Sequence, residues 1–335
     1  MSGFLPVDVR GVVPMSAAID AMAWAFEAVS LGLADMPTRI HMHPAGTDNT
    51  HIFMPVYLPD SPCGRYPAVI TCKAVSIIPA NRGTELPVTI GMVMAIDPKT
   101  GAVTELFHGG SLTAVRTGAA AGLATRLLAN PAADVLAVIG AGGMAFDQVA
   151  AVCAVRNVRR VVISSRTRAR AEALAERVRT ELGVSMVDVI DGANTAVAQA
   201  QIVCTVTTSA EPVFAADAIK PGTHINASGA YLPHMTEIPL ELIAQSGFYV
   251  DRMSSALHES GEVVQGIARG FFTAEHIRGE LGGIASGPTP RRQSAEEVTV
   301  FKSAGMAVQD AAMVAAYLSL SRRRVASPQL WVAVL

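Results

Sequence analysis

The sequence predicts an α/β protein with two domains, and three observations support this fold class. Its 335 residues are enough for two sizeable hydrophobic cores. Hydrophobic residues make up 50% of the chain but aromatic ones only 5%, as is typical of parallel sheets covered by helices on both faces. Strand and helix patterns also alternate from about residue 132 to residue 300.

Residues 1 to about 127 show a mixed pattern. A helix is expected over 16–30, and strands over 38–43, 51–58, 68–78 and 89–97. The turn "DPKTG" then joins the last of these to a strand over 102–108 in a hairpin. A long helix follows over 109–130, with Ser111 or Thr113 as the candidate N-cap and Asn130-Pro131 as the terminator. An Ala-rich helix over 303–324 closes the pattern.

The stretch "DVLAVIGAGGMAFDQ" carries the most specific motif. An apolar strand runs into a glycine turn and then into a helix that we expect to begin near Gly143. Gly140 allows the tight turn, Gly142 lets the backbone approach a pyrophosphate, and Ala145 allows close packing of helix on strand. We therefore predict a Rossmann dinucleotide site that contains Gly140, Gly142, Gly143, Met144 and Ala145.

The next strand ends in "SSRTRAR", where an enzyme that selects NAD usually carries an acid for the ribose 2′-hydroxyl. Here the loop offers Ser165, Arg166, Thr167 and Arg168, and a guanidinium suits a 2′-phosphate. We predict NADPH as the cofactor, with NADH as the alternative. The other interpretation is that these arginines only solvate a loop.

Small polar residues follow two later strands of the same pattern. Strand ends border the ligand crevice in open parallel sheets, so these residues are candidates for the nicotinamide pocket, although they also suit ordinary loops. They are Thr207, Thr208 and Ser209 after one strand, and Ser228, Gly229 and Ala230 after the other.

Three cationic side chains stand in apolar surroundings in the first domain. Lys73 lies in the strand "VITCKAVSII", on the same face as Val69, Thr71, Val75 and Ile77, and neither face looks solvated. Arg116 lies in an apolar helix, and Arg39 in the strand-like "MPTRIHMHP". Each taken singly is as consistent with a structural salt bridge as with a ligand contact. Together they predict a cationic pocket for a substrate carboxylate.

Other classes of function have little support in the sequence. The net charge of −2 gives no footprint for nucleic acid, and the four cysteines form neither a zinc pattern nor a disulfide framework. His41 and His43 share a strand face without an obvious third ligand, so we expect no metal. The N-terminus has no signal-peptide pattern, and no apolar run is long enough for a membrane span. We expect a soluble cytoplasmic protein.

Taken together, these residues resemble the ornithine cyclodeaminase/mu-crystallin family. The resemblance covers nearly the whole chain and rests on stretches that occur in order: "MPTRIHM", "CKAVSIIPANRGTELP", "GMVMAIDPKTGAVTELFHGGSLTAVRTGAAAGLATRLLA", "VIGAGGMA", "TVTTSAEPVF", "IKPGTHINASGAYLPHMTEI" and "FKSAGMAVQDAA".

The resemblance implies a Rossmann domain, residues 128–304, inserted into a substrate-binding and dimerisation domain, residues 1–127 with 305–335. It also implies a homodimer built through the substrate domains. At the family's substrate-binding positions this sequence has Arg39, Lys73 and Arg116. The resemblance implies that the two arginines hold the α-carboxylate and that Lys73 exchanges protons near C2 of the substrate. The family's mu-crystallin-like members carry an Asn-Arg-Thr cofactor loop, to which Ser165-Arg166-Thr167 is similar.

One position departs from the cyclodeaminase pattern. Cyclodeaminases and similar alanine dehydrogenases carry an aspartate just after "INAxG", where it handles the substrate amine, and here that position is Tyr231. A phenol with a pKa near 10 is neither a carboxylate base nor a counter-ion at neutral pH. The departure favours reduction of an imine over cyclisation of ornithine.

The sequence thus predicts an NADPH-dependent oxidoreductase that reduces a cyclic 2-imino acid, Δ1-pyrroline-2-carboxylate or Δ1-piperideine-2-carboxylate, to proline or pipecolate. Lys73 is the predicted catalytic residue, and Arg39, Arg116 and Tyr231 are the predicted substrate contacts. One alternative is an ornithine cyclodeaminase or amino-acid dehydrogenase that uses NAD, with Glu237 or His234 in place of the aspartate. A second alternative is a non-catalytic binding protein like mu-crystallin.

Overall fold

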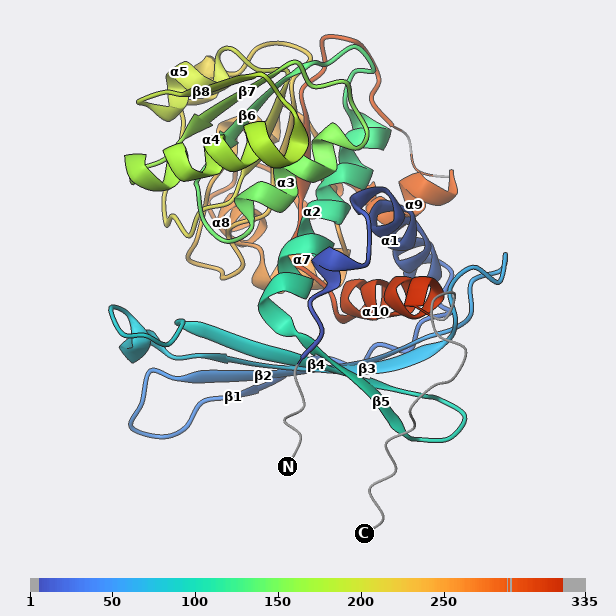
Figure 1. Ribbon diagram of the computed structural model, residues 1–335. Coiled ribbons are helices and arrows are strands. Elements are labelled where there is room, and N and C mark those ends of the chain that lie inside the picture. Colours follow the sequence, from blue (N-terminus) through green and yellow to red (C-terminus); the bar gives the residue numbers. More distant parts are fainter. Residues whose placement is uncertain (1–5, 288, 290, 322–335) are drawn as a thin grey trace. The chain divides into compact units, whose positions relative to one another are not determined.

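The structure is a computed structural model that describes residues 6–287, 289 and 291–321 (Figure 1). It divides into two compact units, which are described separately below. The first consists of Met1–Arg116 and Met306–Leu335, and the second is Thr117–Gly305. The α/β fold class is confirmed. The predicted domain boundaries at 127/128 and 304/305 stay a prediction. Along the chain, the boundaries of the compact units fall within helix α2 (Gly109–Leu128) and after Gly305.

The first unit is built on a five-stranded antiparallel sheet with the strand order β1-β2-β3-β4-β5. Helix α10 packs against β2, β3 and α1, so the two helices cover one face of the sheet (Figure 1). The elements are β1 (Ile40–Met42), β2 (Thr50–Leu58), β3 (Val69–Ile77), β4 (Thr89–Ile96), β5 (Val103–His108), α1 (Met15–Ser30), α10 (Ala307–Ser321) and the short helices η1 (Val9–Gly11) and η2 (Pro79–Asn81).

Strand β3 alternates as the sequence predicts. Val69, Thr71 and Lys73 are buried on the face that the helices cover, because successive side chains point to opposite sides of a sheet. The expectation that neither face is solvated is wrong, since Ala74 on the opposite face is exposed. Lys73 thus stands in the middle of the sheet with its side chain in the core layer.

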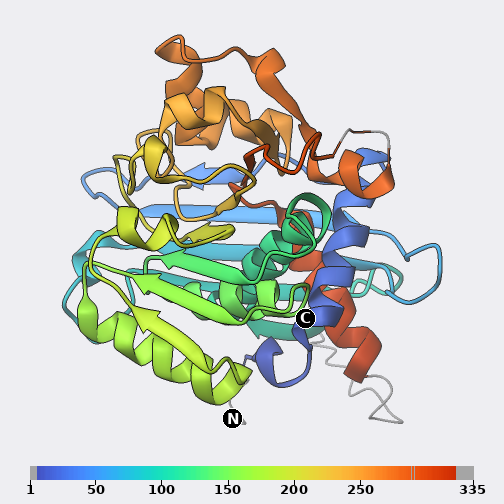
Figure 2. The same ribbon diagram turned by 90° about the horizontal axis from the view of Figure 1, so that it is seen from above.

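The second unit contains an eight-stranded sheet whose strand pairs are all parallel, with the order β12-β11-β13-β10-β9-β6-β7-β8. Figure 2 shows the green strands β6 and β7 side by side. The strands are β6 (Val135–Ile139), β7 (Arg160–Ser164), β8 (Met186–Val189), β9 (Ile202–Thr205), β10 (His224–Ala227), β11 (Gly247–Val250), β12 (Ile277–Glu280) and β13 (Thr299–Lys302).

Helices complete the parallel unit, and the sheet has an apolar core on each face. In β6, for example, Leu136 and Val138 belong to one core while Ala137 and Ile139 belong to the other. The helices are α3 (Ala145–Cys153), α4 (Arg168–Leu182), α5 (Ala193–Val197), α6 (Leu240–Ala244), α7 (Met253–Glu259), α8 (Gly261–Ala268), α9 (Leu281–Ser286) and the short η3 (Ala216–Ala218) and η4 (Ala274–His276). In the part of the chain that the structure describes, no helix combines the length and hydropathy needed to cross a bilayer.

Three predicted boundaries are wrong by a few residues. Helix α2 begins at Gly109, before either predicted N-cap, because His108 Nδ1 accepts a hydrogen bond from the Ser111 N–H and takes the capping role. Helix α3 begins at Ala145 rather than near Gly143. Arg39 lies one residue before β1 instead of inside a strand. The predicted extension of the last helix to residue 324 lies outside the described residues.

Candidate active site

Lys73 reaches from the sheet to a carboxylate on the last helix of the same unit. Its Nζ lies 3.0 Å from Asp310 Oδ2 and donates a hydrogen bond to Thr113 Oγ1 at 3.2 Å. Lys73 is only 5% exposed and Asp310 only 1%. The prediction that the Lys73 side chain is not solvated is therefore confirmed, although the opposite face of its strand is exposed, and Asp310 is the partner for its charge.

Arg116 joins the same cluster one turn of α2 beyond Thr113. Its Nε lies 3.5 Å from Asp310 Oδ1, and its Nη1 donates a hydrogen bond to Gln309 Oε1 at 2.9 Å. Gln309 Oε1 also accepts the Met306 N–H at 2.8 Å, which fixes the start of α10. One carboxylate is thus shared between a buried ammonium and a buried guanidinium.

Several neighbouring charges act on Lys73. Burial lowers the pKa of the Lys73 ammonium, Asp310 opposes this shift, and the positive charges of Arg116 and Arg39 add to it. Arg39 is half-buried and is close enough to Lys73 to act on its titration. Lys73 and Arg116 thus share the Asp310 carboxylate, and the charge of Arg39 also acts on Lys73. Cationic groups gathered in this way suit a carboxylate ligand.

Sequence reasoning missed Asp310 and Gln309. Both lie in "FKSAGMAVQDAA", which supported the family resemblance but received no role in the site. The available signal was a carboxylate beside an amide in an otherwise apolar, Ala-rich helix, since a buried acid requires a partner. The pattern could not say that the partner is Lys73, which is 237 positions away.

The glycine turn after β6 has the form that a dinucleotide needs. Gly140 has φ +102, and a Cβ there would lie 2.9 Å from the Val206 carbonyl oxygen, so the tight turn requires glycine. A Cβ on Gly142 or Gly143 would meet nothing within 4 Å, which leaves open space at the N-terminal end of α3. Ala145 is fully buried against the strand layer. These residues fit a pyrophosphate bound at a helix N-terminus.

The two central arginines of the loop after β7, Arg166 and Arg168, differ in their contacts. Arg168 pairs with Glu172 at 2.9 Å and with Asp191 at 3.3 Å, so it matches the interpretation of a solvated, ion-paired loop. Arg166 is exposed and has no ion-pair partner among the residues that the structure describes. Ser165 Oγ accepts the Thr167 N–H at 3.3 Å and shapes the turn. Because Arg168 is already paired, Arg166 is the better candidate of the two to bind a 2′-phosphate.

The ends of β9 and β10 bring the predicted nicotinamide-site residues to neighbouring loops of the parallel sheet. The strands end at Thr205 and Ala227, which are register partners. The Thr207 N–H donates to Glu237 Oε1 at 2.6 Å, whereas Thr208 is exposed. The hydroxyl of Ser228 is buried without a hydrogen-bond partner in the described part of the chain.

Tyr231 follows these loops and is 37% exposed, with a phenol pKa that burial raises further. The alternative that Glu237 replaces the family aspartate is wrong. Glu237 is fully buried, and three backbone N–H groups occupy its two carboxylate oxygens. His234 is exposed.

Comparisons with known proteins agree with this arrangement. A model of the ornithine cyclodeaminase/mu-crystallin family matches residues 4–319. The Δ1-pyrroline-2-carboxylate reductase of Bacillus cereus (strain ZK / E33L) is 36% identical over 310 residues, which cover 92% of this chain and 93% of the relative. The ketimine reductase mu-crystallin of Mus musculus is 36% identical over 249 residues, or 74% of either chain.

A solved structure is similar over the same extent. The Δ1-pyrroline-2-carboxylate reductase of Thermococcus litoralis, in complex with NADH and L-proline, aligns with a TM-score of 0.88 and 32% identity. The alignment covers 95% of this chain and 97% of that one.

Proposed function

This chain belongs to the ornithine cyclodeaminase/mu-crystallin family, and we propose that it is an NADPH-dependent oxidoreductase that reduces cyclic 2-imino acids to the corresponding cyclic amino acids. Δ1-Pyrroline-2-carboxylate and Δ1-piperideine-2-carboxylate are the proposed substrates, and proline and pipecolate the products. The observation that carries the proposal is the buried cluster in which the side chains of Lys73 and Arg116 both lie against the carboxylate of Asp310. Such a cluster suits a small carboxylate-bearing substrate with a nitrogen that must gain a proton.

Each side chain has a defined task in this reaction. Arg39 and Arg116 hold the substrate carboxylate and thereby orient C2. Lys73 holds a proton at Nζ and gives it to the imine nitrogen, so that the C=N bond becomes a C–N bond and the nitrogen ends as an amine. Asp310 keeps Lys73 protonated until that moment. NADPH supplies the hydride when it is bound.

The cofactor would be held by the residues that line the glycine turn and the loop after β7. Gly142 and Gly143 leave room for the pyrophosphate, and Arg166 is the proposed contact for the 2′-phosphate. The Arg166→Ala variant should raise the KM for NADPH about tenfold while leaving the KM for NADH unchanged, since a charged hydrogen bond is lost from one cofactor only. Arg168→Ala is the matched control, because Arg168 already has two carboxylate partners.

We also propose that the protein is a homodimer formed through the sheet of the first unit. A cross-strand row on the face opposite α1 and α10 runs through Ile40, Phe53, Ala74 and Met92, and no described helix of that unit covers it. Ile40 is 55% exposed and Met92 40%, so this row offers apolar side chains for contact with a second copy of the chain. Sedimentation should give twice the chain mass. A cytoplasmic location stays a prediction.

The direct test measures the oxidation of NADPH and NADH with a panel of cyclic imino acids, and with pyruvate plus ammonia or methylamine. We expect turnover with the five- or six-membered cyclic imino acids, and faster turnover with NADPH. Proline formed from ornithine with catalytic NAD would instead identify a cyclodeaminase. No oxidation with any substrate would identify a non-catalytic binding protein.

A further inference from the structure

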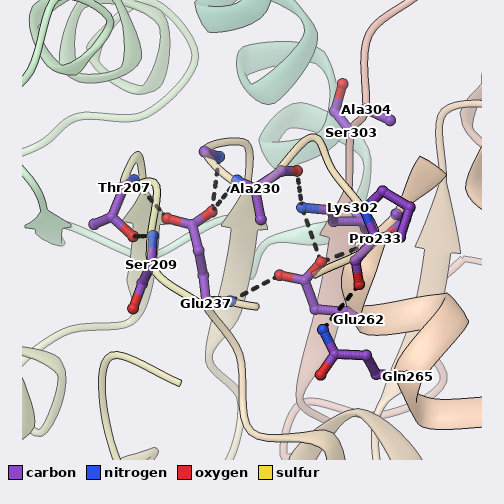
Figure 3. A network of polar contacts seen from close by, with 12 residues as sticks. Thr207, Ser209, Ala230, Pro233, Glu237, Glu262, Gln265, Lys302, Ser303 and Ala304 are labelled. Carbon is purple, nitrogen blue, oxygen red and sulfur yellow. Dashed lines mark hydrogen bonds and ion pairs between the residues drawn. The ribbon is translucent and has the colours of Figure 1, made fainter. Parts of the chain in front are cut away.

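Four residues of the second unit form a closed ring of buried polar contacts (Figure 3). The carboxylate of Glu237 accepts the Ala230 N–H at 3.0 Å, and the Ala230 carbonyl accepts a hydrogen bond from Lys302 Nζ at 2.6 Å. Lys302 Nζ lies 3.0 Å from Glu262 Oε2, and Glu262 Oε1 accepts the Glu237 N–H at 2.9 Å. The three charged members of this ring are each at most 1% exposed.

The ring also ties two loops together. Besides Ala230, the Glu237 carboxylate accepts the Gly229 N–H at 2.7 Å and the Thr207 N–H at 2.6 Å. Thr207 follows β9 and Gly229 follows β10, so one side chain fixes the loops that leave two neighbouring parallel strands. In an open parallel sheet this edge borders the ligand.

The backbone around the ring is packed so closely at Gly229 and Gly261 that a side chain does not fit at either position. A Cβ on Gly229 would lie 2.2 Å from the backbone nitrogen of Thr207 and 2.6 Å from Glu237 Oε1. A Cβ on Gly261, which precedes Glu262, would lie 1.7 Å from the Met235 carbonyl oxygen. Both glycines permit a backbone approach that any other residue would prevent, and the contacts of Glu237 depend on that approach.

The hydrogen bonds indicate the charge state of Glu237. Burial and the nearby Glu262 raise the pKa of its carboxyl, while Lys302 and the N–H donor of Thr207 lower it. The three backbone groups that contact the two oxygens are all donors, which suits a carboxylate. Both oxygens of Glu237 are thus engaged by the backbone of the protein.

We propose that Glu237, supported by Glu262 and Lys302, is a positioning residue that holds the loops at Thr207 and at Gly229-Ala230 in the form that binds the nicotinamide half of the cofactor. The same ring fixes both backbone groups of Ala230 and thereby the starting point of Tyr231, the next residue. This inference rests on the proposed use of NADPH. It assigns to Glu237 a role in ground-state geometry and no exchange of protons.

The test compares two ligands that differ only in the part that the loops would touch. NADPH contains the nicotinamide, whereas 2′-phospho-ADP-ribose keeps the phosphates and lacks it. In Glu237→Gln an amide nitrogen faces backbone donors, so we expect NADPH to bind about tenfold more weakly by calorimetry. The Kd of 2′-phospho-ADP-ribose should change by less than about twofold, because its contacts lie at the glycine turn and the loop after β7.

Arg156→Met is the matched control for general destabilisation. Arg156 donates to carbonyls at the end of α2, among them those of Thr125 and Ala129, so its loss weakens the same unit elsewhere. It should lower the melting temperature without changing the ratio of the two Kd values. Glu237→Asp, which keeps the charge but is one methylene shorter, should change that ratio in the same direction as Glu237→Gln and serves if the glutamine variant does not fold.

The outcomes separate the inference from the proposed function. Equal weakening of both ligands by the Glu237 variants, or no weakening, would overturn the positioning role while the cofactor proposal stands. Failure of the unaltered protein to bind NADPH would overturn the cofactor proposal and this inference with it. Binding without imine reduction would leave the ring's role measurable and would contradict only the proposed substrate.

Discussion

Two buried lysines, one in each unit, occupy similar strands but have opposite surroundings. Lys73 lies in "VITCKAVSII" and Lys302 in "VTVFKSAG", both among apolar residues and both at most 5% exposed. Lys73 shares the carboxylate of Asp310 with Arg116. Lys302 contacts Glu262 and a backbone carbonyl in a ring that also contains Glu237. In the first cluster two cationic side chains contact one carboxylate, and in the second one cationic side chain lies with two acidic ones.

The difference is the one that our proposal requires between a binding site and a scaffold. In the proposed reaction, the cationic side chains around Lys73 also hold the substrate carboxylate. In the ring around Lys302, backbone groups of the protein surround the carboxyl of Glu237. Burial alone therefore does not distinguish a catalytic lysine from a structural one, and the neighbours of each lysine have to be compared.

The largest expected effect is on turnover. Lys73→Met should lower kcat about 10²–10⁴-fold, since it removes the proposed proton donor, and should leave the Kd of NADPH unchanged. Steady-state kinetics with the cyclic imino acids and calorimetry with NADPH measure the two quantities. Substantial residual kcat in this variant would contradict the role of Lys73. Neither Lys73 nor Lys302 would then have a catalytic role.

The second prediction concerns stability, for which we expect a larger effect at Lys302 than at Lys73. Lys302→Met should lower the free energy of unfolding by about 3 kcal/mol, because it leaves Glu262 buried without its counter-charge. Lys73→Met should cost less, since Asp310 keeps Arg116 as a partner. Denaturant unfolding of both variants under the same conditions gives the comparison. If Lys73→Met proved the more destabilising of the two, the cluster around Lys73 would be the structural one.

The same two strands define what could be predicted from the sequence. Burial of Lys73 follows from local alternation, and the nucleotide turn follows from a strand, three glycines and a helix that are adjacent in the chain. The counter-charge of Lys73 comes from a helix 237 positions away, where spacing carries no information. The N-cap of α2 was missed for a different reason, since the acceptor is a histidine ring directly before the helix and not one of the usual Ser, Thr, Asp or Asn side chains.

Glu237 illustrates the same limit. Its position near Tyr231 in the chain made it a candidate for the missing carboxylate, and only the fold reveals that backbone donors from two other loops occupy it. Proximity in sequence gives the neighbourhood of a side chain but not the direction in which its functional group points. The pattern therefore predicted the α/β fold class and the burial of Lys73, while its anionic partner required the structure.

The smallest of the expected effects tests how Asp310 opposes the influences that lower the pKa of Lys73. Asp310 raises the pKa of Lys73, whereas burial and Arg116 lower it. In Asp310→Asn only the lowering influences remain, so Lys73 loses its proton at a lower pH than in the unaltered protein. Because the protonated form is the active acid, the alkaline limb of kcat/KM should move to lower pH, and kcat at neutral pH should fall about tenfold.

The KM for the imino acid should not rise in this variant, because the pocket loses a negative charge and attracts the carboxylate at least as well. Asp20→Asn is the matched control, since Asp20 is an exposed carboxylate of the same unit paired with Arg65, and it should leave the alkaline limb in place. An alkaline limb that stayed fixed in Asp310→Asn, or moved to higher pH, would mean that another group titrates in catalysis. The cluster around Lys73 would then lack the catalytic role that distinguishes it from the ring around Lys302.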